Sequence, residues 1–187
     1  QHALALQVAG ATDRMRVLVT GAGPIGLGTA LFARIQGADV HLLDLSEARL
    51  SQAGEKFGFE KQHLAGSDIL TGTLSDGFDV IFDATGSARA IEAGFQLLAH
   101  GSRYVLVSVV KDQIRFDDPE FHKRETQIIG SRNATAEDFE TVIAAIRDGL
   151  IDTDGLCSLT IPVREIAGRF EDLANDRETL IKAVVTL

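Results

Sequence analysis

Three closely spaced glycines, lying between a strand-like run and a helix-like run, constrain this chain more than any other feature. They are Gly21, Gly23 and Gly26, and they follow residues 17–20, a short run rich in residues with high β propensity. A mostly apolar, helix-like stretch over residues 25–36 comes next. At this spacing the first glycine permits a sharp turn, the second lets another group approach the backbone, and the third lets the helix pack closely on the strand. The pattern predicts a strand, a tight turn and a buried helix.

The residues around this turn fit a dinucleotide site. Pro24 has no N–H and lies where the helix begins, so the free donors at the helix N-terminus would be the amides of Ile25 and Gly26. Amides in this position bind phosphate groups. Asp44 ends a second strand-like run, 40–43, close to the offset of about 20 residues at which a carboxylate holds a ribose diol. We interpret the stretch as a dinucleotide-binding βαβ unit, the alternative being a tight turn that binds nothing.

Composition excludes several classes of function. The 187 residues carry a net charge of −9, which would repel nucleic acid and gives no basic stripe for a membrane surface. Cys157 is the only cysteine, so no internal disulfide and no multi-cysteine zinc site is expected. No run approaches transmembrane length, and a cytoplasmic setting is expected. None of the histidines shows metal-ligand spacing, and we predict structural or surface roles for all of them: His2, His41, His63, His100 and His122.

Strand-like and helix-like segments alternate through residue 131. Several of the strand-like runs are continuously apolar, which indicates a parallel sheet covered on both faces. We therefore predict an α/β fold with a doubly wound, six-stranded parallel sheet of the Rossmann type. The expected strands lie near residues 17–20, 40–43, 61–65, 78–83, 103–109 and 127–131, and the expected helices near 25–36, 46–57 and 88–98.

The last third of the chain changes character. Thr135 followed by Asp138 predicts a capped helix that ends at Gly149. A strand-like run at 156–161, a helix after Pro162 and a terminal strand at 183–187 complete the sequence. We expect three parts: a lead-in helix (1–14), the Rossmann domain (15–149), and a helical and strand tail (150–187) made to pack on a structure outside this chain.

The order of these motifs resembles a known enzyme family. The segments that carry the likeness, besides Asp44, are VLVTGAGPIG (17–26), FDVIFDATGS (78–87), RYVLVSVV (103–110), FHKRETQIIGSRNAT (121–135) and IKAVVTL (181–187). Together they resemble the C-terminal, cofactor-binding half of zinc-type medium-chain alcohol and polyol dehydrogenases. The segment at 121–135 is most similar to the branch that includes sorbitol, idonate, gulonate and galactonate dehydrogenases. The resemblance implies that a GroES-like catalytic domain, with the zinc ligands and the proton relay, would lie before Gln1.

For the adenosine side of the cofactor, the resemblance implies that Asp44 holds the ribose and that Arg49 lies beside it. Thr85 and Gly86 would line the cofactor cleft at the end of the fourth strand. Because the negative charge of Asp44 would repel a 2′-phosphate, NAD is favoured over NADP, and Arg49 leaves NADP open as the alternative.

For the rest of the cofactor, the resemblance implies that the nicotinamide carboxamide meets backbone groups around Val107, Ser131 and Asn133. Lys182, in the last strand, would approach the pyrophosphate. The family usually has glycine where this chain has Ser108, which implies a different local geometry of that loop.

Taken together, these features indicate the cofactor-binding domain of an oxidoreductase that transfers hydride between NAD and a polyol, a sugar acid or another secondary alcohol. The expected partners are NAD and such a small-molecule substrate, within a homodimer or homotetramer by analogy. No catalytic residue and no metal ligand is expected in this chain; zinc is expected only in the missing domain, so the isolated chain should be inactive. Two alternatives stay open: a stand-alone NAD-binding or sensing module, and a methyltransferase-type domain that binds an adenosyl cofactor. The glycine spacing and the six strands argue against the second.

Overall fold

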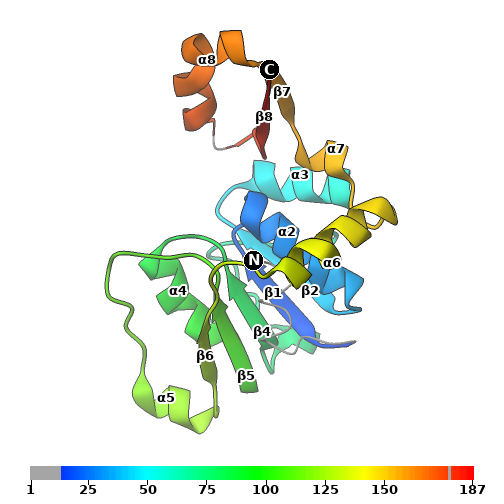
Figure 1. Cartoon of the computed structure of the whole chain (residues 1–187). Coiled ribbons are helices and arrows are strands. Elements are labelled where there is room, and N and C mark those ends of the chain that lie inside the picture. Colours follow the sequence, from blue (N-terminus) through cyan, green and yellow to red (C-terminus); the bar gives the residue numbers. More distant parts are fainter. Residues whose placement is uncertain (1–13, 177) are drawn as a thin grey trace.

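A six-stranded parallel sheet forms the centre of the molecule, as predicted (Figure 1). The computed structural model describes residues 14–176 and 178–187, so the expected lead-in helix lies almost wholly outside the described residues. The strand order is β3-β2-β1-β4-β5-β6, which places the point of reversal between β1 and β4. The strands are β1 (Arg16–Thr20), β2 (Asp39–Asp44), β3 (Gln62–Leu64), β4 (Phe78–Asp83), β5 (Leu98–Leu106) and β6 (Gln127–Gly130).

Helices cover both faces of the sheet. One face packs against α2 (Pro24–Ile35), α3 (Glu47–Phe57) and α6 (Ala136–Arg147), and the other against α4 (Ala88–Gly94). Alternate residues of β1 therefore enter different cores: Val17 and Val19 lie on the α2 side, and Leu18 packs with Ile91 of α4. Because both faces are buried, each strand needs apolar residues at consecutive positions, which explains the unbroken apolar runs in the sequence.

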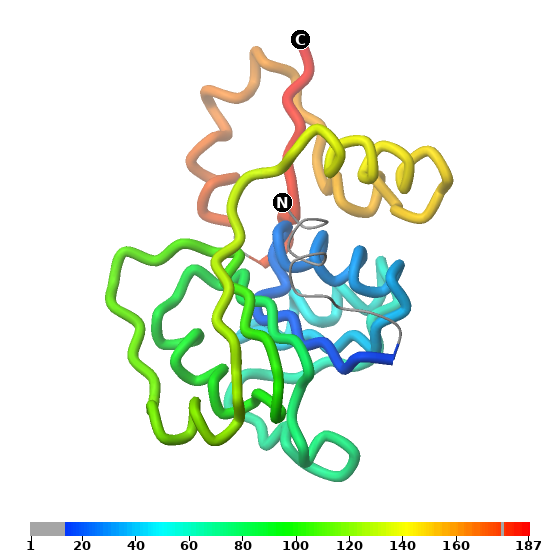
Figure 2. The backbone as a smooth tube through the Cα atoms, turned by 60° about the horizontal axis from the view of Figure 1, so that its bottom comes forward, coloured from blue at the N-terminus to red at the C-terminus, as the bar shows by residue number. Residues whose placement is uncertain are grey.

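Two predicted helix starts are confirmed by their caps. The Ser46 hydroxyl accepts a hydrogen bond from the Arg49 N–H at the start of α3. At α6 the Thr135 hydroxyl accepts from the Asp138 N–H, and the Asp138 carboxylate accepts from the Thr135 N–H, which completes a capping box. Figure 2 shows the chain after β6 crossing to α6, which brings α6 back to the face that α2 covers.

The predicted boundaries between β4 and β6 were wrong. The helix expected over 88–98 ends at Gly94, a 3₁₀ turn η2 (Phe95–Leu97) follows, and β5 begins at Leu98 rather than near 103. Gly101 lies inside β5 at φ +68°, so it bends the strand. A short helix, α5 (Asp118–Lys123), was missed. Its cap is Asp117, whose carboxylate accepts the Glu120 N–H at 2.9 Å.

The tail forms a small unit beyond α3 (Figure 1). It contains α7 (Thr153–Leu156), β7 (Leu159–Pro162), α8 (Val163–Asn175) and β8 (Ala183–Thr186), with β7 and β8 paired in parallel. The strand expected at 156–161 starts later because α7 occupies its first residue. Cys157 is exposed, since it follows α7 at the surface. Ile181 and a hydrogen bond from Gln52 to the Thr179 carbonyl join the tail to the main core.

Candidate functional site

The glycine turn lies at the carboxyl end of β1, beside the end of β4. Gly21 has φ +93°, which favours glycine, and its N–H donates to the Leu43 carbonyl at 2.7 Å. A Cβ on Gly26 would lie 1.7 Å from the Gly21 carbonyl oxygen, so α2 approaches the turn as only glycine allows. At Gly23 the nearest atom to a Cβ would be Arg49 Nη1 at 3.6 Å. Within 4 Å, a Cβ on Gly23 would thus meet only the end of a flexible side chain.

The N-terminus of α2 presents the donors that a phosphate needs. The Leu27 N–H donates to the Gly23 carbonyl at 2.8 Å, which makes the first hydrogen bond of the helix. The amides of Ile25 and Gly26 precede that bond, and Pro24 has no N–H. The helix dipole places partial positive charge at the same point. The arrangement fits an anion such as a pyrophosphate.

Asp44 ends β2, as predicted, and has a second task that the sequence did not reveal. One carboxylate oxygen accepts the Ala22 N–H at 2.6 Å, and the other accepts the Ser46 N–H at 2.9 Å. The side chain therefore holds both the glycine turn and the start of α3. A carboxylate has about four acceptor positions, so two stay available for ribose hydroxyls. Arg49 lies beside Gly23, so the structure brings Asp44, Arg49 and the turn together.

The ends of β4 and β5 carry a buried carboxylate that sequence reasoning missed as a site residue. Asp83 is fully buried and accepts the Thr85 hydroxyl at 2.6 Å. Thr85 and Gly86 follow it at the exposed edge, with Gly86 at φ +68°. The Val107 N–H donates to the Asp83 carbonyl at 2.9 Å, so the two strand ends are held side by side. An acid that directly follows the apolar run 80–82 was the available signal.

The end of β6 continues the same edge of the sheet, next to the end of β5. The Ser131 N–H donates to the Leu106 carbonyl at 3.0 Å, which joins the ends of β6 and β5. Among the described residues, Ser131 Oγ is buried without a hydrogen-bond partner. Asn133 follows in the left-handed conformation at φ +65°. Thr85, Val107 and Ser131 thus lie along neighbouring strand ends.

Lys182 is the one predicted cofactor residue in the tail. It directly precedes β8, its side chain is exposed, and its N–H donates to Ser158 Oγ at 3.3 Å. Within the described part of the chain, no hydrogen bond or ion pair links Lys182 to the glycine turn.

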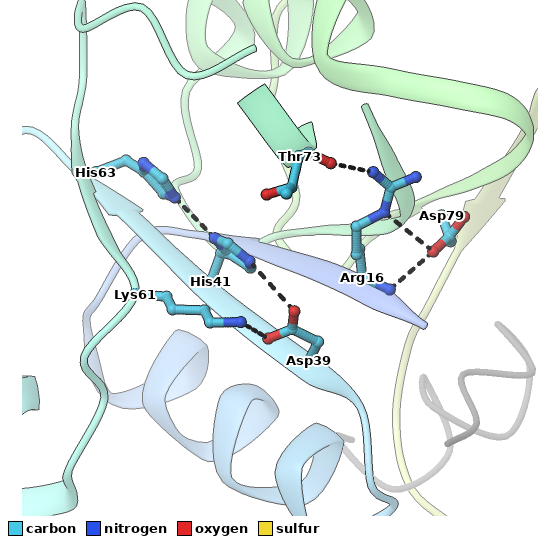
Figure 3. A network of polar contacts seen from close by, with 7 residues as sticks. All are labelled: Arg16, Asp39, His41, Lys61, His63, Thr73 and Asp79. Atoms are coloured by element: carbon cyan, nitrogen blue, oxygen red, sulfur yellow. Dashed lines mark hydrogen bonds and ion pairs between the residues drawn. The ribbon is translucent and has the colours of Figure 1, made fainter. Parts of the chain in front are cut away.

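A second polar cluster lies towards the opposite, amino end of the sheet (Figure 3). His41 Nδ1 and His63 Nε2 are 2.9 Å apart, and the rings are stacked. Lys61 Nζ lies 2.5 Å from the Asp39 carboxylate, which also faces His41 Nε2 at 3.8 Å. Burial lowers the pKa of His41 to about 4, although the Asp39 charge acts in the opposite direction. Burial also lowers the pKa of His63. This environment fits the structural role that we predict for both histidines.

The described residues, 14–176 and 178–187, contain no cluster of three or more His, Cys, Asp or Glu side chains that would hold a metal ion. Nor do they include a helix with the length and apolar character needed to cross a bilayer.

Comparison with known proteins gives consistent matches. A family model described as zinc-binding dehydrogenase matches residues 24–148. L-galactonate-5-dehydrogenase of Escherichia coli K12 is 38% identical over 179 residues, which cover 91% of this chain and 52% of that enzyme. The chain spans about half the length of the curated relatives it matches.

Solved structures share the fold. An alcohol dehydrogenase of E. coli CFT073 complexed with NADH superimposes with a TM-score of 0.88 at 23% identity, covering 100% of this chain and 56% of that one. A proposed zinc-binding dehydrogenase of Sinorhizobium meliloti 1021 bound to NADP superimposes with a TM-score of 0.87 at 21% identity, covering 98% of this chain and 55% of that one.

Proposed function

Because this chain belongs to the zinc-binding dehydrogenase family, we propose that it is the NAD-binding part of an enzyme that oxidises a polyol, a sugar acid or another secondary alcohol. The family resemblance seen in the sequence is confirmed. The sugar-acid branch is favoured by the likeness to L-galactonate-5-dehydrogenase. The observation that carries the proposal is the glycine turn at the reversal point of the sheet, with Asp44 beside it.

Each half of the cofactor would meet its own set of residues. The amides of Ile25 and Gly26 would bind the pyrophosphate, and the open acceptor positions of Asp44 would take the adenosine ribose hydroxyls. The nicotinamide would lie near Thr85, Val107 and Ser131. NAD supplies the hydride acceptor, and this chain fixes its position.

Further predicted contacts extend this site. Gly86 would line the cleft beside Thr85, Asn133 would add a backbone group at the nicotinamide end, and Arg49 and Lys182 would contribute positive charge near the ribose and the pyrophosphate. Zinc would be held by a catalytic domain, as the sequence resemblance implies, so we expect the 187-residue chain alone to have no turnover.

The tail supports the idea of a missing neighbour. No residue of α8 is buried, and several apolar side chains of residues 150–187 are exposed. Apolar surface of this kind is typical of a face that another domain covers. We propose that residues 150–187 pack on the catalytic domain and that 15–149 form the cofactor domain. A stand-alone NAD-binding module without catalysis is the alternative, and this exposed surface disfavours it. The exposed apolar residues are Leu150, Val163, Phe170, Val184, Val185 and Leu187.

The sheet has an edge that suits self-association. Among the described residues, strand β6 pairs with β5 alone, and Ile128 on it is exposed. A strand edge of this kind readily pairs with a second chain. We propose a homodimer, or a homotetramer built from it.

Calorimetry with NAD and NADP tests the proposed function. We expect the chain to bind NAD more tightly than NADP. In Asp44→Asn the loss of charge-assisted hydrogen bonds should weaken NAD binding about tenfold or more, and the preference over NADP should shrink. The matched control is Asp68→Asn, an exposed acid in the loop after β3, which should bind both cofactors as the unchanged chain does. If the unchanged chain binds neither cofactor, the proposal is wrong.

A further inference from the structure

A single buried carboxylate links three strand ends at the carboxyl edge. Asp83 is 0% exposed and closes β4. One of its oxygens accepts the Thr20 hydroxyl of β1 at 3.2 Å and the Thr85 hydroxyl at 2.6 Å. The other oxygen accepts the hydroxyl of Ser108, which follows β5, through a short contact.

Neutral donors, and not a cation, surround this carboxylate. In the part of the chain that the structure describes, its partners are three hydroxyls and, at 3.4 Å, the Thr85 N–H. A buried charge is tolerated only when it is hydrogen-bonded, and Ser108 is the one donor recorded among the described residues for its Asp83 oxygen, so the loss of that hydroxyl leaves the oxygen without compensation. The positions of Thr85 and Ser108 are therefore fixed more firmly than those of ordinary loop residues.

The backbone of Asp83 holds the same loop. Its carbonyl oxygen accepts the N–H of Val107 at 2.9 Å and the N–H of Ser108 at 3.1 Å. Side chain and backbone together clamp the first residues after β5 against the residues after β4. The clamp joins two loops that come from different strands.

The hydrogen bonds that Ser108 makes lie on one side of the reversal point, although the Asp83 carboxylate also accepts the Thr20 hydroxyl of β1. The glycine turn and Asp44 belong to β1 and β2, whereas Thr85 and Val107 follow β4 and β5. Under the proposed function, the first pair meets the adenosine half of the cofactor and the second pair meets the nicotinamide half. A change at Ser108 should therefore affect one end of the cofactor.

We propose that Asp83 is a positioning residue for the nicotinamide end of the site and that the Ser108 hydroxyl is the donor that locks the loop after β5 onto it. The inference rests on the proposed NAD-binding function. It assigns Asp83 and Ser108 no contact with the cofactor; they act through Thr85 and Val107. The ligand part that depends on them is the nicotinamide nucleoside, and ADP-ribose, which lacks the nicotinamide, should not depend on them.

The experiment compares NAD with ADP-ribose by calorimetry on the 187-residue chain. We expect Ser108→Ala to weaken NAD binding about fivefold to tenfold and to change ADP-ribose binding less than twofold. Ser108→Thr keeps the hydroxyl and should restore NAD binding. The matched control is Ser102→Ala, a buried serine on the same strand β5 that contacts Thr126 Oγ1 at 3.4 Å, and it should leave both affinities unchanged.

The possible outcomes separate the two claims. Equal weakening of NAD and ADP-ribose in Ser108→Ala would mean a structural role alone and would overturn the inference, as would no change in either affinity. An unchanged chain that binds NAD no more tightly than ADP-ribose would overturn it as well. Failure of the unchanged chain to bind either ligand would instead overturn the proposed function.

Discussion

Both ends of the parallel sheet carry polar groups, but the partners of those groups differ between the two ends. At the amino end, charges meet opposite charges: Arg16 lies against Asp79, and Lys61 lies against Asp39 (Figure 3). At the carboxyl end, the donors are the backbone amides at the N-terminus of α2, and a Cβ on Gly23 would meet only the Arg49 side chain. Among the described residues each end also holds one buried polar atom without a hydrogen-bond partner, His41 Nε2 and Ser131 Oγ. A polar cluster or a lone unpaired atom therefore does not identify a binding site by itself. Backbone donors at a helix N-terminus do so better.

The histidine pair at the amino end has its nearest polar partners within the protein. His41 and His63 share one hydrogen bond, and the remaining ring nitrogen of His41 faces Asp39 at 3.8 Å. The polar side chains of the amino end interact with one another, so their contribution is to stability. We propose that the carboxyl end contributes to binding instead. The predictions below test this division, beginning with the largest expected effect.

Gly26→Ala should disrupt the carboxyl end most strongly. The added Cβ would lie 1.7 Å from the Gly21 carbonyl oxygen, and both partners are backbone or directly attached to it. The helix must move away from the turn, which should lower the free energy of unfolding by about 3 kcal/mol or more. Urea denaturation measures this loss. NAD binding should be lost as well, because the turn and the helix N-terminus shift together.

The matched control for this change is Gly168→Ala in α8. There a Cβ would meet nothing within 4 Å, so only helix propensity changes. Alanine is favoured over glycine in a helix by up to about 1 kcal/mol, and stability should stay equal or rise. If the two alanine variants had equal stability, close packing at Gly26 would not be what that glycine provides.

Acid should destabilise the protein through the amino end. Burial lowers the pKa of His41 from 6.5 to about 4, so the unfolded chain takes up a proton first as the pH falls. The contribution is present near pH 7, is lost between about pH 6.5 and pH 4, and amounts to about 3 kcal/mol. In His41→Leu the free energy of unfolding should depend less on pH over this range. His122→Leu, at an exposed position, should keep the original dependence.

The sequence was sufficient for the turn and the fold class. Glycine spacing and apolar runs are local signals, and at Gly21, Gly26 and Asp44 the local signal and the tertiary requirement agree. The capping box at Thr135 was predictable for the same reason. The predicted cofactor contacts themselves stay predictions.

What the sequence could not supply were the long-range contacts. Gly94 ends α4 where it faces Tyr104, whose hydroxyl donates to the Ile91 carbonyl, and this contact joins residues of different elements. No local pattern marks it, so the helix was predicted too long. Asp83 was missed for a similar reason, because its donors Thr20 and Ser108 are distant in the sequence.

Lys61→Met should give the smallest effect and sharpen the contrast between the two ends. Lys61 and Asp39 are 2.5 Å apart, but their side chains are 52% and 39% exposed, so water screens the pair. The loss of this ion pair should lower the free energy of unfolding by less than about 1 kcal/mol, and by less still in high salt.

The Lys61 charge also helps to lower the pKa of His41. Its removal should therefore raise the His41 pKa in an NMR titration, and acid should then destabilise the variant less. NAD binding, which we propose to occur at the opposite end of the sheet, should not change. A change in NAD affinity would mean that the two ends are coupled through β2.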